Sequence, residues 1–314
     1  MAERILSLLP STTEIAGALG LADQLVGRSH ECTLPAGVER LPVVTEPKLD
    51  VHAPSAAIDR RVKELVREGL SVYRVDAELA RSLRPTVILT QTQCEVCAVT
   101  PADLEAAACE WIGLAPRLVA VAPNTLADVL DDVVRVAEGC GVTERGRAVR
   151  AREALRVEAI TARAAEAARR AGRRPRVASL EWIEPLMGAG NWLPELIERA
   201  GGESVLGRGG HDAAWSSLDE LARVDPDVLV IAPCGFDLGR TRAEAGPLVS
   251  EPRFRELRAV REGRVFLADG FLHFNRPGPR IAESLEIYAE LLWPDALRFG
   301  HRGCAFERFA AAGS

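Results

Sequence analysis

The sequence lacks the features that mark membrane and exported proteins. It contains no stretch of about 18 consecutive apolar residues, which a membrane-spanning helix requires. The apolar run Ile5–Leu9 is too short for the core of a secretory signal, and Pro10 follows it directly. We therefore predict a protein with neither a membrane span nor a signal peptide.

Cysteine and basic segments are also scarce. Seven cysteines are spread over 314 residues, and this odd number does not suit a disulfide framework. The count favours a reducing compartment, so we predict a cytoplasmic protein.

The net charge is −6, and the one dense basic segment, 169–176, lies at the end of a predicted helix, where positive charge is favoured anyway. These features exclude nucleic acid as the expected partner.

The motifs of the common enzyme classes are missing as well. We find no Ser-His-Asp order, no P-loop, no H-E-x-x-H and no G-x-G-x-x-G after a predicted strand. Their absence favours binding over catalysis, and it leaves enzymatic activity an open question.

Strands and helices alternate along most of the chain, which is typical of an α/β fold with parallel sheets. One helix stands out, because Thr143–Ala171 is rich in Ala, Arg and Glu and would reach roughly 44 Å at 1.5 Å per residue. We predict an N-terminal α/β lobe over residues 1–123, a helical linker over 124–173 that contains this long helix, a C-terminal α/β lobe over 174–296 and a tail over 297–314. An ordinary long surface helix within one domain is the alternative.

Polar, thiol and aromatic residues follow several of the predicted strands. Because the carboxyl ends of parallel strands meet at one edge of a sheet, this edge is where α/β folds hold ligands. The residues there include Ser11, His30 and Cys32, the segment Gln93–Cys97, and Cys234. A second group, Asp269–Arg280, supplies His273 and two guanidinium groups suited to polar groups on a ligand.

Several segments together resemble a known family. In chain order they read RILSLLPSTTEI, VDAEL with LRPTVILTQ, the long helix, RVASLEW, NWLPELIERAGG, DPDVLVIAPCG, GRVFLADG and FNRPGPR. Their order and spacing resemble the solute-binding proteins of ABC importers with a rigid helical backbone, which carry ferric siderophores or cobalamin, and most of all the cobalamin-binding branch. The resemblance covers about residues 4–294.

The resemblance implies two Rossmann-like lobes with parallel sheets, joined by one long rigid helix, and a ligand cleft between the lobes. It further implies a small-molecule ligand, cobalamin or a related corrinoid, held against aromatic rings, although about half of these rings could simply be core residues. The residues that we predict to contact the ligand are Ser11, His30, Gln93, Trp182, Trp192, Trp215, Phe236, Phe271, Phe274, Asn275 and Arg276.

The same resemblance implies an ABC permease as partner, engaged through one acidic residue on each lobe. The matching residues are Glu78 in VDAEL and Glu198, whose register is fixed by the RAGG that follows it. The alternative is that both are ordinary surface charges.

The cysteines depart from the pattern of that family. Cys32, Cys94, Cys97 and Cys234 follow three different predicted strands, and four thiolates can hold zinc or an iron–sulfur cluster. The alternative function is therefore a metal- or cluster-dependent enzyme. Simple packing of these small side chains is the other possibility.

Overall fold

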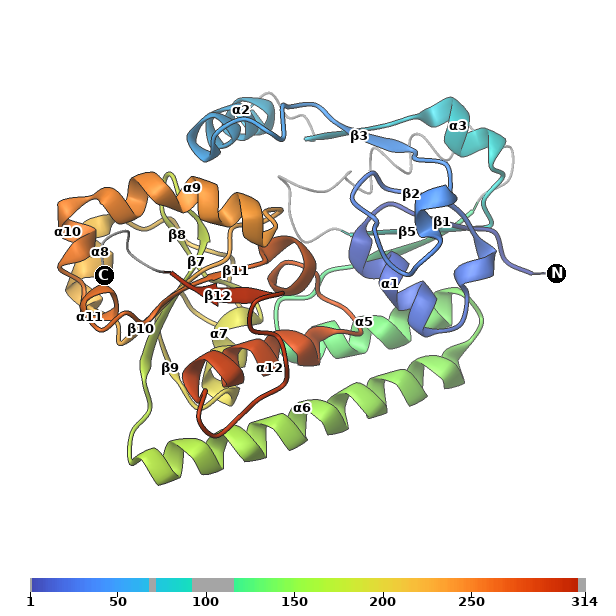
Figure 1. Ribbon diagram of the computed structural model, residues 1–314. Helices are drawn as coiled ribbons and strands as arrows, with labels where there is room; N and C mark the ends of the chain where they lie inside the picture. Colours follow the sequence, from blue (N-terminus) through green and yellow to red (C-terminus); the bar gives the residue numbers. More distant parts are fainter. Residues whose placement is uncertain (1, 68–71, 92–115, 310–314) are drawn as a thin grey trace. The chain divides into compact units, whose positions relative to one another are not determined.

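The computed structural model describes residues 2–67, 72–91 and 116–309 (Figure 1). By its internal contacts the chain forms two compact units. Unit 1 comprises Met1–Ala53, Ala57–Pro123 and Ala127–Arg152, and unit 2 comprises Pro54–Ala56, Asn124–Leu126 and Glu153–Ser314. The division falls inside the long helix.

Unit 1 is built on a parallel sheet. Its strands are β1 (Ile5–Ser7), β2 (Leu25–Arg28), β5 (Val87–Gln91) and β6 (Arg117–Val121), in the order β2-β1-β5-β6, and all three pairings are parallel. A separate antiparallel pair joins β3 (Thr45–Pro47) to β4 (Tyr73–Val75). The helices are α1 (Pro10–Ala18), α2 (Ser55–Arg67), α3 (Ala77–Ser82) and α5 (Leu126–Gly139), with short 3-10 turns at Ala22–Gln24 and Val38–Arg40.

The unit 1 core contains Ile5 and Leu89 from the sheet together with Ile15 from α1 and Val133 from α5. Pro10 begins α1, where its missing N–H costs nothing because the first amides of a helix have no partner within it. Asp76 caps α3 by accepting a hydrogen bond from the backbone N–H of Leu79 at 2.9 Å.

Unit 2 has a larger mixed sheet in the order β12-β11-β10-β7-β8, with β9 also paired to β7. The pairs β7–β10, β10–β11 and β7–β9 are parallel, whereas β8 and β12 pair antiparallel to β7 and β11. The strands are β7 (Arg176–Trp182), β8 (Met187–Gly188), β9 (Glu203–Leu206), β10 (Val228–Ile231), β11 (Val265–Ala268) and β12 (Phe306–Arg308). The helices are α7 (Leu193–Arg199), α8 (Leu218–Val224), α9 (Leu238–Ser250), α10 (Pro252–Arg255), α11 (Arg258–Arg261) and α12 (Ile281–Leu292), with a π-helix at Gly270–Phe274. Its core includes Leu180, Leu229, Leu267 and Phe254.

The long helix α6 spans Thr143–Ala171, as predicted, and has 29 residues. One face is buried through Val149, Val157, Ile160 and Ala164, whereas Leu155 on the opposite face is exposed. Glu144 in the first turn and Arg169 and Arg170 in the last turn have the charges that the helix dipole favours. The predicted α/β fold with parallel sheets and a long helix is thus confirmed.

Two sequence-based predictions for unit 2 differ from the structure. The sequence of Trp215–Ala222 predicts a helix over that range, but α8 begins only at Leu218, because Ser217 caps it by accepting a hydrogen bond from Glu220 N at 3.1 Å. The predicted tail 297–314 contains β12, which pairs with β11 and is tied by the ion pair between Arg242 and Glu307. No helix in the described ranges combines the length and apolar character of a membrane span.

Candidate functional site

The carboxyl edge of the unit 1 sheet carries a buried group of hydroxyls. Ser7 Oγ lies 2.7 Å from Thr12 Oγ1, and Thr13 Oγ1 donates to Ser7 Oγ at 2.8 Å. Cys32 Sγ lies 3.0 Å from Thr13 Oγ1, and Cys32 is 1% exposed within the hydrophobic core. Ser11 Oγ is buried, and none of the residues that the structure describes forms a hydrogen bond with it. Cys32 therefore has the surroundings of a packed thiol.

His30 follows β2 at the same edge. Its Nδ1 lies 2.7 Å from Thr45 Oγ1, which also accepts a hydrogen bond from His30 N at 3.1 Å. The second ring nitrogen, Nε2, is buried and has no hydrogen-bond partner in the described part of the chain. Burial, more than any neighbouring charge, lowers the pKa of His30 below its usual value. The imidazole is consequently neutral at neutral pH, which is the form that binds metal ions.

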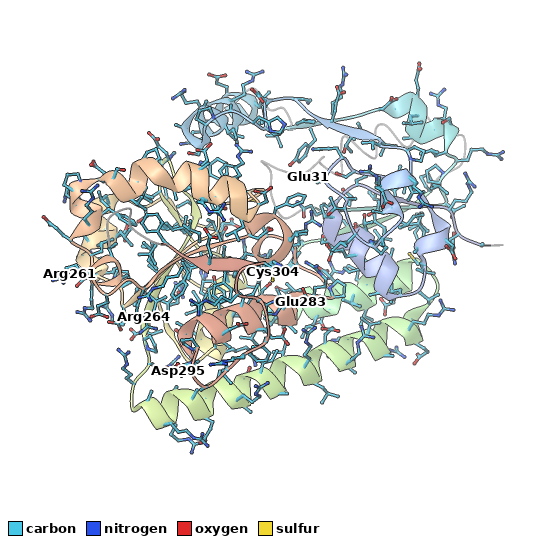
Figure 2. All side chains as sticks on the ribbon, in the orientation of Figure 1. Glu31, Arg261, Arg264, Glu283, Asp295 and Cys304 are labelled. Atoms are coloured by element: carbon cyan, nitrogen blue, oxygen red, sulfur yellow. The ribbon has the colours of Figure 1, made fainter. Side chains whose placement is uncertain are left out.

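Two residues that the sequence analysis did not select lie beside His30. The ring of Tyr73 is 5.1 Å from the imidazole, centroid to centroid, and its hydroxyl donates to Glu31 Oε1 at 3.2 Å. Figure 2 labels Glu31. The only signal for Tyr73 in the sequence is its place in a predicted strand of a protein with two tyrosines in all.

Unit 2 presents a second group at the carboxyl edge of its sheet. Glu181 and Trp182 end β7, and the exposed Cys234 follows β10. The backbone N–H of Cys234 donates to the carbonyl of Glu181 at 2.9 Å, which holds the two strand ends together. Among the described residues, no group of three or more His, Cys, Asp or Glu side chains could hold a metal ion. Cys94, Cys97 and Gln93 lie outside the described residues, so the four-cysteine site stays a prediction.

The aromatic side chains of unit 2 differ widely in exposure. Phe274 is 0% exposed and packs on Tyr288 with ring centroids 5.1 Å apart, and Trp192 is buried with its Nε1–H donating to Phe274 O at 3.3 Å. Trp182 and Phe236 are also buried and contact each other, with ring centroids 5.2 Å apart. Trp215, in contrast, is 53% exposed.

The loop after β11 carries the remaining predicted contact residues. Phe271 is partly exposed, and the guanidinium of Arg276 lies 4.1 Å from the centre of its ring. Asn275 Nδ2 donates to Gly270 O at 3.1 Å. Arg276 is itself buried.

The two predicted docking glutamates are both exposed. Glu78 lies in the first turn of α3. Glu198 lies on α7, where it forms an ion pair with Arg174 and accepts a hydrogen bond from Ser204 N at 2.9 Å.

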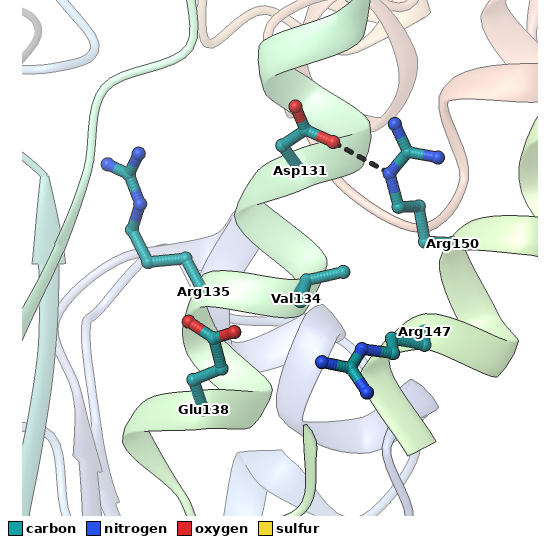
Figure 3. Close-up of a pocket in the computed structure, with 6 residues that line it drawn as sticks. All are labelled: Asp131, Val134, Arg135, Glu138, Arg147 and Arg150. Atoms are coloured by element: carbon teal, nitrogen blue, oxygen red, sulfur yellow. Dashed lines mark hydrogen bonds and ion pairs between the residues drawn. The ribbon is translucent and has the colours of Figure 1, made fainter. Parts of the chain in front are cut away.

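A surface hollow lies elsewhere in unit 1, between α5 and α6 (Figure 3). It is lined by Asp131, Val134, Arg135, Glu138, Arg147 and Arg150. Asp131 Oδ1 accepts from Arg150 Nε at 2.6 Å. With a single apolar residue in its lining, this hollow does not suit a large flat ligand.

Solved structures match the chain over nearly its full length. A periplasmic heme-binding protein from Pseudomonas aeruginosa matches with a TM-score of 0.72 and 21% identity over 99% of both chains. The periplasmic heme-binding protein RhuT from Roseiflexus sp. RS-1 matches with a TM-score of 0.67 and 23% identity, over 94% of this chain and 100% of that one. The periplasmic vitamin B12 binding protein BtuF of Vibrio cholerae matches with a TM-score of 0.64 and 21% identity, over 93% of this chain and 96% of that one. At such identities the likeness shows the fold. No curated protein matches the chain.

A family model described as Periplasmic binding protein matches residues 5–270. The prediction of a cytoplasmic protein is wrong, because this family and the solved structures above are periplasmic binding proteins. That prediction relied on the cysteine count and the sequence start, and neither feature fixes the compartment of a protein. The chain belongs to the Periplasmic binding protein family.

Proposed function

We propose that this binding protein captures a corrinoid of the cobalamin type. The observation that carries the proposal is His30, a neutral, half-buried imidazole whose buried Nε2 has no hydrogen-bond partner among the described residues. When Nδ1–H donates to Thr45 Oγ1, Nε2 carries a lone pair that can bind a metal ion once the ligand displaces the atoms that cover it. The cobalt at the centre of a corrin ring accepts such a nitrogen ligand, which would satisfy the unpaired atom.

The aromatic side chains of unit 2 support a flat ligand. Trp215 is exposed and Phe271 is partly exposed, so these two rings are the ones that we propose for direct contact. For the buried rings of Trp182, Trp192, Phe236 and Phe274 we propose a supporting role. Arg276 and Asn275 would meet polar groups at the rim of the ring, and Ser11 and Gln93 stay proposed contacts in unit 1.

Haem is the second candidate, and Tyr73 favours it. A phenol that donates to a carboxylate, as Tyr73 does to Glu31, is assisted in losing its proton and becoming an oxygen ligand for ferric iron. Two of the solved structures described above are of heme-binding proteins, and one is of a vitamin B12 binding protein.

The experiment is a titration of the purified protein with aquocobalamin, cyanocobalamin and hemin, followed by calorimetry and visible absorption. Aquocobalamin has an exchangeable axial water, whereas the axial cyanide of cyanocobalamin is held firmly. We therefore expect both corrinoids to bind and only the aquocobalamin spectrum to shift.

The variant His30→Gln retains a polar group for Thr45 but is a poor metal ligand. We expect it to abolish the spectral shift and to weaken aquocobalamin binding about tenfold or more, the loss of one good ligand contact. His52→Gln, a change at an exposed histidine of the same unit, is the control. Binding of hemin alone would overturn the corrinoid proposal in favour of haem. Corrinoid binding with an unshifted spectrum would overturn the role of His30.

The thiolate alternative is tested on the same protein. Metal and acid-labile sulfide analysis after anaerobic purification would find stoichiometric zinc, or iron with sulfide, if the predicted four cysteines form a site. Such a result would favour the metal- or cluster-dependent enzyme over the binding protein.

We also propose that an ABC permease is the partner of this protein, engaged through Glu78 and Glu198. Their exposure supports the proposal, and the ion pair of Glu198 with Arg174 would open on docking.

A further inference from the structure

Glu181 occupies an unusual place for an acidic side chain. It lies in β7, which is flanked by β10 on one side and by β8 and β9 on the other, and it is only 7% exposed. Its backbone carbonyl is tied to Cys234 N. A charged residue so deep in a sheet is costly unless it is paired or neutral.

One oxygen of this carboxyl group is fixed by a rigid loop. Glu181 Oε1 accepts a hydrogen bond from Gly190 N at 2.8 Å. Gly190 is required there, because a Cβ atom would come within 2.2 Å of Ala213 N. The next residue, Asn191, has a positive φ of 51°, and its N–H donates to His211 O at 2.6 Å. Among the described residues, the other oxygen, Oε2, makes no hydrogen bond.

Within the described ranges, the groups around Glu181 do not supply a countercharge. From α12, Tyr288 faces it, but the Tyr288 hydroxyl is 2.9 Å from Ser179 Oγ. Two other acids of α12 have separate partners, Glu286 with Arg156 and His301, and Glu290 with the N–H groups of Phe299 and His301.

The titratable groups at the neighbouring strand ends are engaged elsewhere too. After β11, Asp269 accepts from Leu272 N, and Arg276 stacks on Phe271. Cys234 after β10 is exposed. Burial raises the pKa of Glu181 to about 7, and only the hydrogen bond from Gly190 opposes this shift.

We infer that Glu181 is a specificity-determining residue that donates its carboxyl proton to an uncharged acceptor, such as a carboxamide, on the ligand. The inference rests on the proposed function, because the rim of a corrin ring carries carboxamides whereas haem carries carboxylates. A neutral carboxyl group offers one O–H donor and one acceptor oxygen, which match an amide. A ligand carboxylate at the same place would meet a second acid in a buried setting and would be disfavoured.

The test measures the dissociation constant for cyanocobalamin between about pH 6 and pH 8.5, in the wild type and in Glu181→Gln. When Glu181 loses its proton it loses its donor, so we expect wild-type affinity to fall about tenfold over this range, the loss of one hydrogen bond. Glu181→Gln keeps an acceptor for Gly190 N–H and a permanent donor. We expect its affinity to change less than about twofold over the same range.

Asp132 provides the matched control. It is a buried acid of unit 1 whose pKa burial raises to about 7, and it lies on α5. Asp132→Asn should therefore keep the wild-type pH profile of binding. In each monocarboxylic acid derivative of cyanocobalamin, one rim amide is replaced by a carboxylate. The derivative whose carboxylate faces Glu181 should bind the wild type about tenfold more weakly than cyanocobalamin does.

Three outcomes would overturn the inference. A flat wild-type profile, or an unchanged tenfold fall in Glu181→Gln, would do so while leaving corrinoid binding intact. Absence of corrinoid binding at every pH by folded protein would overturn the proposed function as well. A melting curve of each variant confirms folding.

Discussion

His273 and His301 lie close together in unit 2, with ring centroids 6.1 Å apart, yet their surroundings differ. His301 Nε2 is 2.9 Å from Glu286 Oε2, whereas His273 Nδ1 is buried and 3.6 Å from Glu283 Oε2, too far for a hydrogen bond. Glu283 is labelled in Figure 2. Burial, and then the charges of Arg280, His301 and Arg276, lower the pKa of His273 to about 4.

This lowered pKa predicts acid sensitivity. Unfolded His273 takes up a proton near pH 6.5, whereas the folded protein does not until about pH 4, so stability is lost as pH falls through this window. Between about pH 7.5 and pH 5 the loss amounts to about 2 kcal/mol. His273→Gln should remove this share of the pH dependence in urea unfolding. His211→Gln, at an exposed position, should not. Equal pH dependence in His273→Gln and wild type would contradict the assignment.

At the scale of elements, the close approach of α5 and α6 in unit 1 depends on a glycine. A Cβ atom on Gly146 of α6 would lie 2.4 Å from Ala137 Cβ of α5 and 3.2 Å from Val133 O. Two helices can pack this closely only where one side chain is absent, so the pattern of small residues, and not hydrophobic periodicity alone, sets the position of α6 against α5.

Gly146→Ala should therefore destabilise the protein by about 1–3 kcal/mol, because the overpacking outweighs the helix preference of alanine. Gly246→Ala in α9 is the matched control, since no atom lies within 4 Å of its added Cβ. It should be neutral or stabilising by up to about 1 kcal/mol. Chemical denaturation of both variants decides the matter, and a stabilised Gly146→Ala would show that α5 and α6 separate easily.

At the scale of the whole molecule, each compact unit carries one of the proposed docking glutamates. Glu78→Lys combined with Glu198→Lys reverses both charges at exposed positions. We expect ligand affinity to stay within about twofold of wild type, because neither residue lies at the carboxyl edge of a sheet, while uptake through the importer falls at least about tenfold as like charges replace complementary ones. Uptake and calorimetry on the same preparations check this. Unchanged uptake would identify both as ordinary surface charges.

The sequence by itself determined the α/β class and the bounds of α6, because hydrophobic periodicity and helix-forming residues are local properties. It also placed His30, Cys234 and Arg276 after strands. The short strands β8, β9 and β12 were not predicted, because they lack the continuous apolar run that marks β10 and β11. Such short segments become strands only when a partner strand supplies their hydrogen bonds.

Only the tertiary structure decided which of these side chains are exposed, which are buried and which have a shifted pKa. Phe274 and Trp215 both lie beside helices or strands along the chain, so their sequence positions do not distinguish them. Only burial in the fold shows that Phe274 is a core ring and Trp215 an exposed one. The tertiary structure also brings Tyr73 to His30 across 43 positions of sequence and places Gly190 N–H on Glu181. Desolvation and hydrogen bonding depend on residues distant in the chain, so no local pattern could have predicted the lowered pKa of His30 or the raised pKa of Glu181.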